Sequence, residues 1–550
     1  MSSPSIEIYD TTLRDGTQRE GVSYTVEDKL RIADRLDAFG VSFIEAGWPG
    51  SNPRDAEFFA RARDRAWNHA RLAAFGMTRR AAHAPENDPN LQALLAAGTP
   101  VCTLFGKSSP LHVTEVLRTS LDENLKMIEE SVGFVRESGR RVIYDAEHFF
   151  DGYAADSSYA LETLRAAMRG GAEVLVLCDT NGGSLPWRVE EVVKEVGRTL
   201  DFPVGIHTHD DTGCAVANTL AAVQAGARHV QGTINGYGER CGNANLSVII
   251  PNLELKLGYA CVGTEKLKEL NELSRFVADV ANLAFDEHMA YHGKSAFAHK
   301  GGVHVSAMRR HPDSYQHIDP ALVGGGARVV VSELSGRANI LSKAEELCLD
   351  VSQGLELEAL EEIKRSEARG LSYESAEASV ALLLHRRTPG YRAIFQVLDY
   401  HVMVGKRRDS DTFAEATVKL QVGDEVLHTA GEGNGPVSAL SDALRKALTP
   451  VYPEVAKIQL ADYKVRILDG SLGTEAITRV LIDSRSDHDT WSTVGASANI
   501  IEASLAALVD SIEYGLVKSR GARSPVLSKA REHTRGEDVP APARPASVAK

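Results

Sequence analysis

The chain has 550 residues, of which 43% are hydrophobic and 25% are charged, and its formal net charge is -14 at pH 7. This length allows several domains, and the negative charge disfavours binding to nucleic acid or to an anionic membrane surface. No apolar run reaches membrane-spanning length, the N-terminus lacks a signal-peptide pattern, and the six cysteines form no Cys-x-x-Cys pair. We therefore expect a cytoplasmic protein that binds neither nucleic acid nor membrane.

Short β-rich runs alternate with amphipathic stretches of helical spacing over residues 1–262. The expected strands are Ile6–Tyr9, Phe43–Ala46, Leu72–Phe75, Val101–Phe105, Arg141–Tyr144, Val174–Leu177, Val204–His207 and His229–Gln231. The expected helices include Val26–Phe39, Leu121–Glu137, Ala160–Met168, Val189–Leu200 and Ala215–Ala225. This alternation predicts an α/β fold with an N-terminal (β/α)8 TIM barrel, and a doubly wound open sheet is the alternative.

Polar residues stand where these predicted strands end. In a barrel all strands end around one mouth, so such residues would converge there. They include Arg14, Asp15, Glu45, Lys107, Ser108, Asp145, Glu147, Asp179, Thr180, His207 and His209. Asp156 and Ser184 are better interpreted as a helix cap or a turn.

His207 and His209 flank Thr208 at the end of the seventh predicted strand. Side chains two apart on a strand point to the same face, so the two imidazoles can share one divalent metal. Two hydrogen-bonded core histidines are the alternative interpretation. Asp15 and Asn243 would complete a mixed nitrogen and oxygen set, which does not choose among zinc, manganese, magnesium and iron.

The pattern changes in residues 263–385, where we predict mainly helical linker subdomains. Leu267–Leu283 is expected to form a long helix, and Ile340–Leu384 is expected to be mainly helical, with the acidic run Leu355–Glu362 as a solvated face. Between them, Gly-rich sequence around His292, His299 and His304 is either exposed surface or a lid over the barrel mouth.

Residues 386–520 contain an internal repeat. The pairs Thr429 and Thr493, Gly431 and Gly495, Ala439 and Ala503, and Leu444 and Leu508 are each 64 positions apart. Strands at Phe395–Met403, Ala416–Val422, Tyr463–Leu468 and Thr478–Ile482, with helices at Val437–Leu448 and Ile501–Ile512, predict a duplicated βββα domain. We expect Gly-rich turns at Gly431–Gly435 and Gly495–Asn499 and a disordered tail over residues 521–550.

Four motifs together resemble the acetyl-CoA-dependent Claisen synthases, a family that includes 2-isopropylmalate, homocitrate and citramalate synthases. They are Asp10–Gln18, His207–Asp210, Gly236–Asn243 and Phe297–His304. The resemblance extends over nearly the whole chain except the tail. Two further segments, Trp48–Pro53 and Asp145–Tyr153, are most similar to the citramalate synthase branch.

The resemblance implies an acyltransferase that condenses acetyl-CoA with pyruvate and water to give citramalate and CoA in isoleucine biosynthesis. A synthase that uses another 2-oxo acid is the alternative within the class. A non-catalytic amino-acid sensor is the alternative from another class, and the intact set Arg14, Asp15, His207 and His209 speaks against it.

The resemblance also implies roles for individual residues. Asp15, His207, His209 and Asn243 would bind a divalent ion (Zn, Mn or Mg). Arg14 would stabilise developing negative charge, while Glu147 would position Arg14 or the acetyl group, or join proton transfer. Gln18 and Thr180 would bind substrate. His304 and Tyr315 would supply acid–base chemistry from the linker, plausibly that of a second subunit.

For the C-terminal domain, the resemblance implies a regulatory role. We expect the protein to form a homodimer through it and to bind the pathway product, isoleucine, between the two repeats. Backbone N–H groups at the starts of the two helices would receive the amino acid's carboxylate.

Overall fold

A computed structural model describes residues 4–349, 354–406, 412–487 and 489–521. The chain forms two compact units, one made of Met1–Phe297 with Ile318–Ala327 and the other of Ala298–His317 with Arg328–Lys550. We propose residues 1–262, 263–385 and 386–520 as the three domains. The predicted tail, from residue 522 on, lies outside the described residues. No helix in the described part is long and apolar enough to cross a membrane.

The first unit contains a closed barrel of eight parallel strands in sequence order, which confirms the predicted barrel and all eight predicted strands. The strands are β1 Glu7–Asp10, β2 Phe43–Gly47, β3 Arg71–Met77, β4 Val101–Lys107, β5 Arg141–Glu147, β6 Val174–Asp179, β7 Val204–Thr208 and β8 His229–Gly232. Strand β1 pairs with both β2 and β8, and this closes the barrel. Strands β2, β6, β7 and β8 are buried at every position, as expected for a parallel sheet covered on its outer face by helices.

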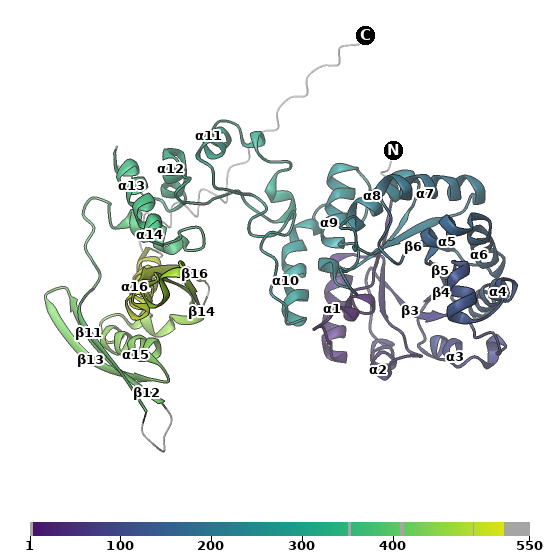
Figure 1. Ribbon diagram of the computed structural model, residues 1–550, viewed down its shortest axis with the longest axis horizontal. Coiled ribbons are helices and arrows are strands. Elements are labelled where there is room, and N and C mark those ends of the chain that lie inside the picture. The colour runs from purple at the N-terminus through teal and green to yellow at the C-terminus, as the bar shows by residue number, and fades with distance from the viewer. Residues whose placement is uncertain (1–3, 350–353, 407–411, 488, 522–550) are drawn as a thin grey trace, which may run out of the picture. The chain divides into compact units, whose positions relative to one another are not determined.

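Helices surround this barrel (Figure 1). They are α1 Val26–Phe39, α2 Pro53–Ala62, α3 Pro89–Ala96, α4 Leu121–Glu137, α5 Phe149–Ala155, α6 Ser157–Gly170, α7 Pro186–Leu200, α8 Ala215–Ala225 and α9 Leu246–Pro251. The prediction did not specify α2 and α3, whose starts are marked by Asn52-Pro53 and Asp88-Pro89, an N-cap followed by proline. Asp156 caps α6, as predicted, by accepting a hydrogen bond from the N–H of Tyr159.

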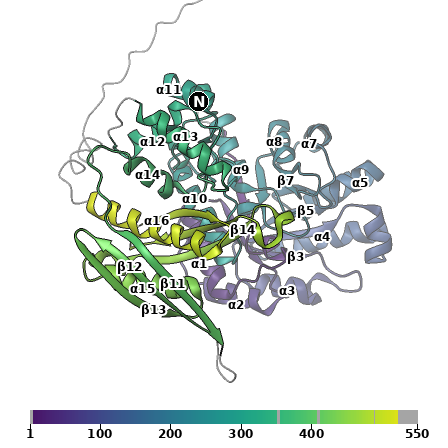
Figure 2. The same ribbon diagram turned by 60° about the vertical axis from the view of Figure 1, so that its left-hand side comes forward.

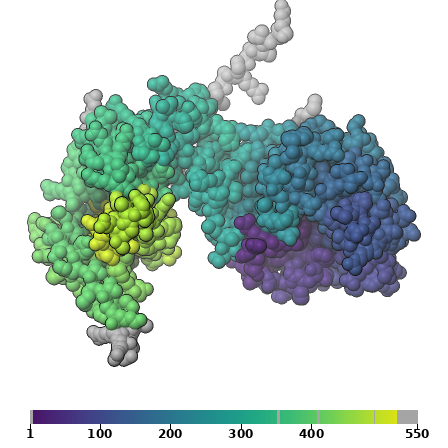
Figure 3. All heavy atoms as spheres, in the orientation of Figure 1, coloured from purple at the N-terminus to yellow at the C-terminus, as the bar shows by residue number. Residues whose placement is uncertain are grey.

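The barrel core has two layers. Inside the strands, a small cluster that includes Tyr9, Phe43, Ile143 and Val176 fills the interior. Outside them, a much larger cluster lies between strands and helices. The space-filling view shows the outer surface of the helices and loops that cover it (Figure 3). The filled interior of the barrel supports the strand ends from below and holds their side chains in fixed positions.

The linker region is mainly helical, as predicted. Its helices are α10 Leu270–Val280, α11 Gly302–Arg310, α12 Arg337–Glu346, α13 Leu355–Ala368 and α14 Glu377–His385. The predicted helix Leu267–Leu283 is shorter in the structure, because it begins with a 3-10 turn at Lys266–Glu269 and ends at Val280. Two short strands, β9 Ala298–His299 and β10 Arg328–Val329, pair in parallel.

One acidic residue of the linker differs from the predicted solvated face. Glu356 is 2% exposed and pairs with Arg337. A buried carboxylate needs such a partner, so this residue links α12 to α13 instead of facing water.

The C-terminal part is a duplicated βββα unit, as predicted (Figure 2). The first copy has β11 Gln396–Lys406, β12 Thr412–Val422, β13 Glu425–Gly433 and α15 Pro436–Leu448; the second has β14 Gln459–Ile467, β15 Thr478–Arg485, β16 Thr490–Ser497 and α16 Ile500–Gly521. Each sheet is antiparallel. The same hydrogen bond occurs in both copies. Oγ1 of Thr429 donates to the carbonyl of Ala443, and Oγ1 of Thr493 donates to the carbonyl of Ala507, each at 2.8 Å.

The prediction of Gly-rich turns at Gly431–Gly435 and Gly495–Asn499 is wrong for the first residues of each range. Gly431 lies within β13 and Gly495 within β16. A Cβ on Gly431 would lie 2.3 Å from the backbone nitrogen of Ala443, and one on Gly495 would lie 2.0 Å from the carbonyl oxygen of Ala503. Glycine is needed at both positions because each helix packs directly on the strand backbone.

Candidate metal centre and active site

A cavity of about 200 Å³ opens at the carboxyl ends of the barrel strands. It is lined by Arg14, Asp15, Gln18, Trp48, Phe75, Phe105, Asp145, Glu147, Cys178, Thr180, His207, His209, Glu239 and Arg240. Charged and polar residues from separate strands thus meet at one mouth, together with an aromatic wall.

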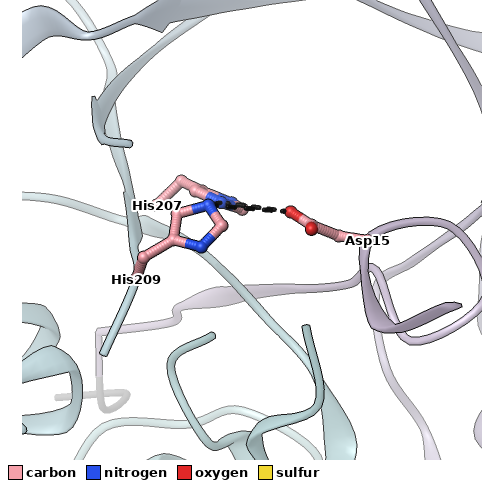
Figure 4. A group of neighbouring side chains, drawn as sticks. All are labelled: Asp15, His207 and His209. Carbon is pink, nitrogen blue, oxygen red and sulfur yellow. Dashed lines mark hydrogen bonds and ion pairs between the residues drawn. The ribbon is translucent and has the colours of Figure 1, made fainter. Parts of the chain in front are cut away.

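Asp15, His207 and His209 form a buried cluster within this cavity (Figure 4). The Nε2 atom of His207 lies 3.2 Å from Nε2 of His209 and 3.4 Å from Oδ2 of Asp15. The Nε2 atom of His209 lies 4.0 Å from the same carboxylate oxygen. Three ligand atoms that converge in this way can hold one divalent cation.

The strand geometry explains why the two histidines face each other. Thr208, between them, turns outward and donates its hydroxyl hydrogen bond to the carbonyl of Ala215 at 3.1 Å. Its neighbours on either side therefore point into the barrel. Asp15 reaches the same point from the 3-10 turn Asp15–Gln18, which follows β1.

Unsatisfied buried oxygens show that this cluster fits a cation. Oδ1 of Asp15 and Oδ1 of Asn243 are both buried without a hydrogen-bond partner among the described residues. Asn243 is fixed nearby, because it forms a β-bridge with His209 and its Nδ2 donates to the carbonyl of Tyr237 at 3.2 Å. Buried polar atoms are seldom left unpaired in native proteins, and a metal held by Asp15, His207 and His209 would satisfy the Asp15 oxygen.

The electrostatics favour the metal-binding forms of Asp15 and His209, whereas burial, which would lower the pKa of His207, is outweighed by Asp15, which raises it. Burial alone would raise the pKa of Asp15, but Arg14 and His207 hold it well below its usual range, so the carboxylate is ionised. Burial and the neighbouring His207 lower the pKa of His209 to about 4, so its imidazole is neutral at pH 7. Neutral imidazole and ionised carboxylate are the metal-binding forms of these groups.

Arg14 is held from three sides beside the cluster. Its Nε donates to Oε1 of Glu45 at 2.6 Å, and its Nη1 lies 3.4 Å from Oδ2 of Asp15. The guanidinium carbon lies 3.8 Å from the centre of the Phe75 ring. Burial would lower the pKa of Arg14, but Glu45 and Asp15 raise it above its ordinary value, so Arg14 stays charged.

The sequence analysis did not assign a role to Glu45. This carboxylate is fully buried and also accepts hydrogen bonds from the hydroxyls of Tyr9, at 2.6 Å, and Thr11. Glu147 instead forms an ion pair with Lys107 at the rim. Of the two carboxylates, Glu45 is therefore the one that positions Arg14.

The aromatic wall of the cavity was also not assigned from sequence. Phe75 and Phe105 stack with ring centres 5.1 Å apart, and Trp48 meets both rings edge-on. The indole N–H of Trp48 donates to Oδ1 of Asn90 at 2.6 Å. This bond from α3 fixes the ring, so the wall is rigid.

Thr180 also lines the cavity. Its hydroxyl accepts a hydrogen bond from the backbone N–H of His148 at 2.8 Å, and its carbonyl accepts one from Arg240 at 2.8 Å. His148 has a positive φ of 57°, which is uncommon for a residue other than glycine. The loops after β5, β6 and β8 are thereby joined at Thr180.

The comparisons with known proteins agree with this architecture. Residues 5–277 match the HMGL-like family, residues 292–370 the homocitrate synthase post-HMGL domain-like family, and residues 374–516 the LeuA allosteric (dimerisation) domain. The chain is 52% identical over 517 residues to the (R)-citramalate synthase of Geobacter sulfurreducens, an overlap that covers 94% of this chain and 98% of that protein. The chain belongs to the (R)-citramalate synthase family.

A second (R)-citramalate synthase and a 2-isopropylmalate synthase are also similar to the chain. The chain is 52% identical over 526 residues to the (R)-citramalate synthase of Synechocystis sp., covering 93% of this chain and 96% of that protein. It is 31% identical over 522 residues to the 2-isopropylmalate synthase of Methanocaldococcus jannaschii, an overlap that covers 93% of this chain and 95% of that protein. The resemblance inferred from the motifs is confirmed, and the chain is an acyltransferase.

His304 and Tyr315 lie in the region that matches the homocitrate synthase post-HMGL domain-like family, residues 292–370. They lie in the second compact unit, where their rings stack with centres 4.2 Å apart. His304 is exposed and Tyr315 is 44% exposed. The structure therefore brings these two predicted residues together as a stacked, solvent-exposed pair, and neither lines the cavity at the barrel mouth.

Proposed function

We propose that the chain condenses acetyl-CoA with pyruvate and water to give (R)-citramalate and CoA, at the entry to isoleucine biosynthesis. The observation that carries this proposal is its near-full-length identity of 52% to (R)-citramalate synthases. The buried cluster beside Arg14 supports an intact catalytic site, which argues against a non-catalytic sensor.

Asp15, His207, His209 and Asn243 are proposed to hold a divalent ion, with zinc, manganese and magnesium as candidates. Such an ion, when bound, polarises the carbonyl of a 2-oxo acid. The convergent Asp15, His207 and His209 atoms and the unpaired Oδ1 of Asn243 support this assignment.

Arg14 is proposed to stabilise the negative oxygen that forms when the pyruvate carbonyl is attacked. Its guanidinium is already fixed by Glu45 and Phe75, so little reorganisation is needed as the charge develops. Thr180 and Gln18, which line the same cavity, are proposed to bind the substrate carboxylate. Glu147 is proposed to orient the acetyl group or to join proton transfer, since the cavity also reaches its side chain.

His304 and Tyr315 are proposed to serve proton transfer at the acetyl methyl group. Loss of one methyl proton gives the enolate, whose carbon forms a bond to the pyruvate carbonyl carbon. The former carbonyl oxygen takes up a proton, and water then hydrolyses the thioester to release CoA and the free carboxylate.

The rigid aromatic wall favours a small 2-oxo acid. Trp48, Phe75 and Phe105 occupy the side of the cavity beside Arg14, and their mutual packing leaves them little freedom to move. A pocket that discriminates by one methylene gains about 1–3 kcal/mol, so larger acids such as 2-oxobutanoate should react, but less well. Phe105→Leu should shift kcat/KM toward 2-oxobutanoate.

A direct assay tests the activity. Purified full-length protein is incubated with acetyl-CoA, a divalent metal and one of four acids: pyruvate, 2-oxobutanoate, 2-oxoisovalerate or 2-oxoglutarate. Release of CoA with the highest kcat/KM for pyruvate is expected. A preference for 2-oxoisovalerate or 2-oxoglutarate would contradict the substrate assignment, and no release with any acid would contradict the enzyme assignment.

The duplicated domain is proposed to form a homodimer and to bind isoleucine. Its match to the LeuA allosteric (dimerisation) domain supports both roles.

Isothermal calorimetry of the full-length protein should give heat with isoleucine. Removal of the residues after Leu384 should abolish inhibition by isoleucine. Light scattering on the same samples separates loss of the effector site from loss of the dimer. Absence of heat with isoleucine, leucine or valine would contradict the effector proposal.

A further inference from the structure

A polar chain of three buried side chains runs across the barrel interior behind the candidate metal centre. Oε1 of Gln231, on β8, lies 3.0 Å from Nδ1 of His207, on β7. Nε2 of the same amide donates to Oδ1 of Asp145, on β5, at 2.9 Å. Gln231 is 0% exposed, Asp145 is 4% exposed and His207 is 5% exposed, so both hydrogen bonds are buried.

Burial raises the pKa of Asp145 to about 7, and for its ionised form the chemistry of the amide fixes the direction of the hydrogen bonds between these three residues. An amide nitrogen only donates hydrogen bonds and an amide oxygen only accepts them. Because the Asp145 carboxylate takes the Nε2 hydrogen, the oxygen of Gln231 faces His207. The Nδ1 of His207 must then carry the proton and donate it to Gln231.

This direction decides which nitrogen of His207 is free. With its proton on Nδ1, the imidazole presents the lone pair of Nε2, the atom that lies 3.4 Å from Asp15 and 3.2 Å from Nε2 of His209. His209 has no equivalent support, since its Nδ1 is buried without a hydrogen-bond partner among the described residues. The two histidines therefore differ: the tautomer of one is fixed by the barrel, and that of the other is not.

We propose that Gln231, held in orientation by Asp145, is a positioning residue that fixes the ring and tautomer of His207 for binding a divalent metal. The inference rests on the proposed metal site and extends it to two residues outside the ligand set. Side chains that hold metal-binding histidines in this way typically change metal affinity by about 10–100-fold when removed.

A metal-binding measurement without substrate tests the proposal. Full-length protein, freed of metal, is titrated with Zn²⁺ in competition with a chromophoric chelator. Gln231→Met keeps the side-chain length and removes both polar atoms, and its Kd for Zn²⁺ should rise about 10–100-fold. Gln231→Glu keeps an acceptor for Nδ1 and should bind Zn²⁺ more tightly than Gln231→Met.

A double-mutant cycle tests whether Asp145 affects metal binding through its hydrogen bond to Gln231 or directly through its charge. If Asp145 acts only through Gln231, adding Asp145→Ala to Gln231→Met should cause little further loss of Zn²⁺ affinity, whereas independent effects would add. Val230→Ala is the matched control. Val230 is equally buried on the same strand, and its side chain points to the opposite face of the sheet from Gln231. The control variant should lower the melting temperature and leave the Kd unchanged.

Three results would overturn the proposal: a wild-type Kd for Gln231→Met, additive losses in the double variant, or an equal loss of affinity in Val230→Ala. If Gln231→Met does not fold, Asp145→Asn and Asp145→Ala decide, because the asparagine keeps an acceptor for Gln231. The proposal then requires the alanine variant to lose more affinity, and equal losses contradict it. Failure of the metal site itself is recognised separately, by wild-type Zn²⁺ affinity in Asp15→Ala.

Discussion

Arg14 donates a hydrogen bond from Nε to Oε1 of Glu45 at 2.6 Å, and this carboxylate is completely buried. The pair joins the turn after β1 to strand β2 and leaves the other guanidinium nitrogens turned toward Asp15 and the cavity. A buried ion pair of this kind fixes geometry more than it adds stability, because desolvation offsets much of its Coulomb attraction.

Glu45→Gln should therefore impair turnover more than folding. The glutamine keeps the shape but not the charge that orients Arg14, and a misplacement of the order of 1 Å costs roughly 10²-fold in rate. Steady-state release of CoA from acetyl-CoA and pyruvate gives kcat, and circular dichroism reports the fold. Tyr9→Phe is the control: it removes one hydrogen bond to Glu45 and leaves Arg14 paired. Equal kcat values in Glu45→Gln and wild type would show that Glu45 does not position Arg14.

Arg14→Lys should retain the positive charge and lose about 10²–10³-fold in kcat, the usual cost of removing one oxyanion donor. Lysine cannot keep Nε on Glu45, a second nitrogen near Asp15 and a planar face on Phe75 at the same time. Stopped assays across pyruvate concentrations separate kcat from KM. A change in KM alone would assign Arg14 to substrate binding only.

Asp15→Ala and His207→Ala should each lose CoA release and metal content while the barrel stays folded. The core lies below the cluster, in the interior layer around Tyr9 and Ile143, so neither substitution touches it. Metal analysis after dialysis, melting temperature and activity are measured on the same preparations. Chelation of the wild-type protein should reproduce the loss, and addition of metal should reverse it only in the wild type. Full activity of either variant after chelation would refute the ligand assignment.

Gly495→Ala should destabilise the C-terminal domain by about 1–3 kcal/mol, the range for overpacking a close contact. The added Cβ would lie 2.0 Å from the carbonyl oxygen of Ala503 and push α16 away from β16. Gly470→Ala is the matched control in the same repeat, because no atom lies within 4 Å of its added Cβ. Differential scanning calorimetry compares the two variants. Equal transitions would mean that the helix tolerates the displacement.

The sequence by itself determined the repeated elements and the approximate positions of the strands. Short β-rich runs and helical spacing are local properties, so the eight barrel strands and the helices α1, α4 and α8 follow from short windows of sequence. The duplicated βββα unit follows from residues that recur 64 positions apart. The His-x-His spacing is local as well, and it placed His207 and His209 on one face of the strand before any contact was known.

Only the tertiary structure decided which distant groups meet inside the barrel. Glu45 holds Arg14 from 31 positions away, and Gln231 joins Asp145 across 86 positions. Glu45, Gln231 and Asp145 lie on buried strands, where a polar side chain gives no sign of its partner. Likewise, Gly431 and Gly495 suggested turns until the helices were seen to pack on them. Strand order, register and closure of the barrel bring such groups together, and these are properties of the whole sheet that no short window of sequence contains.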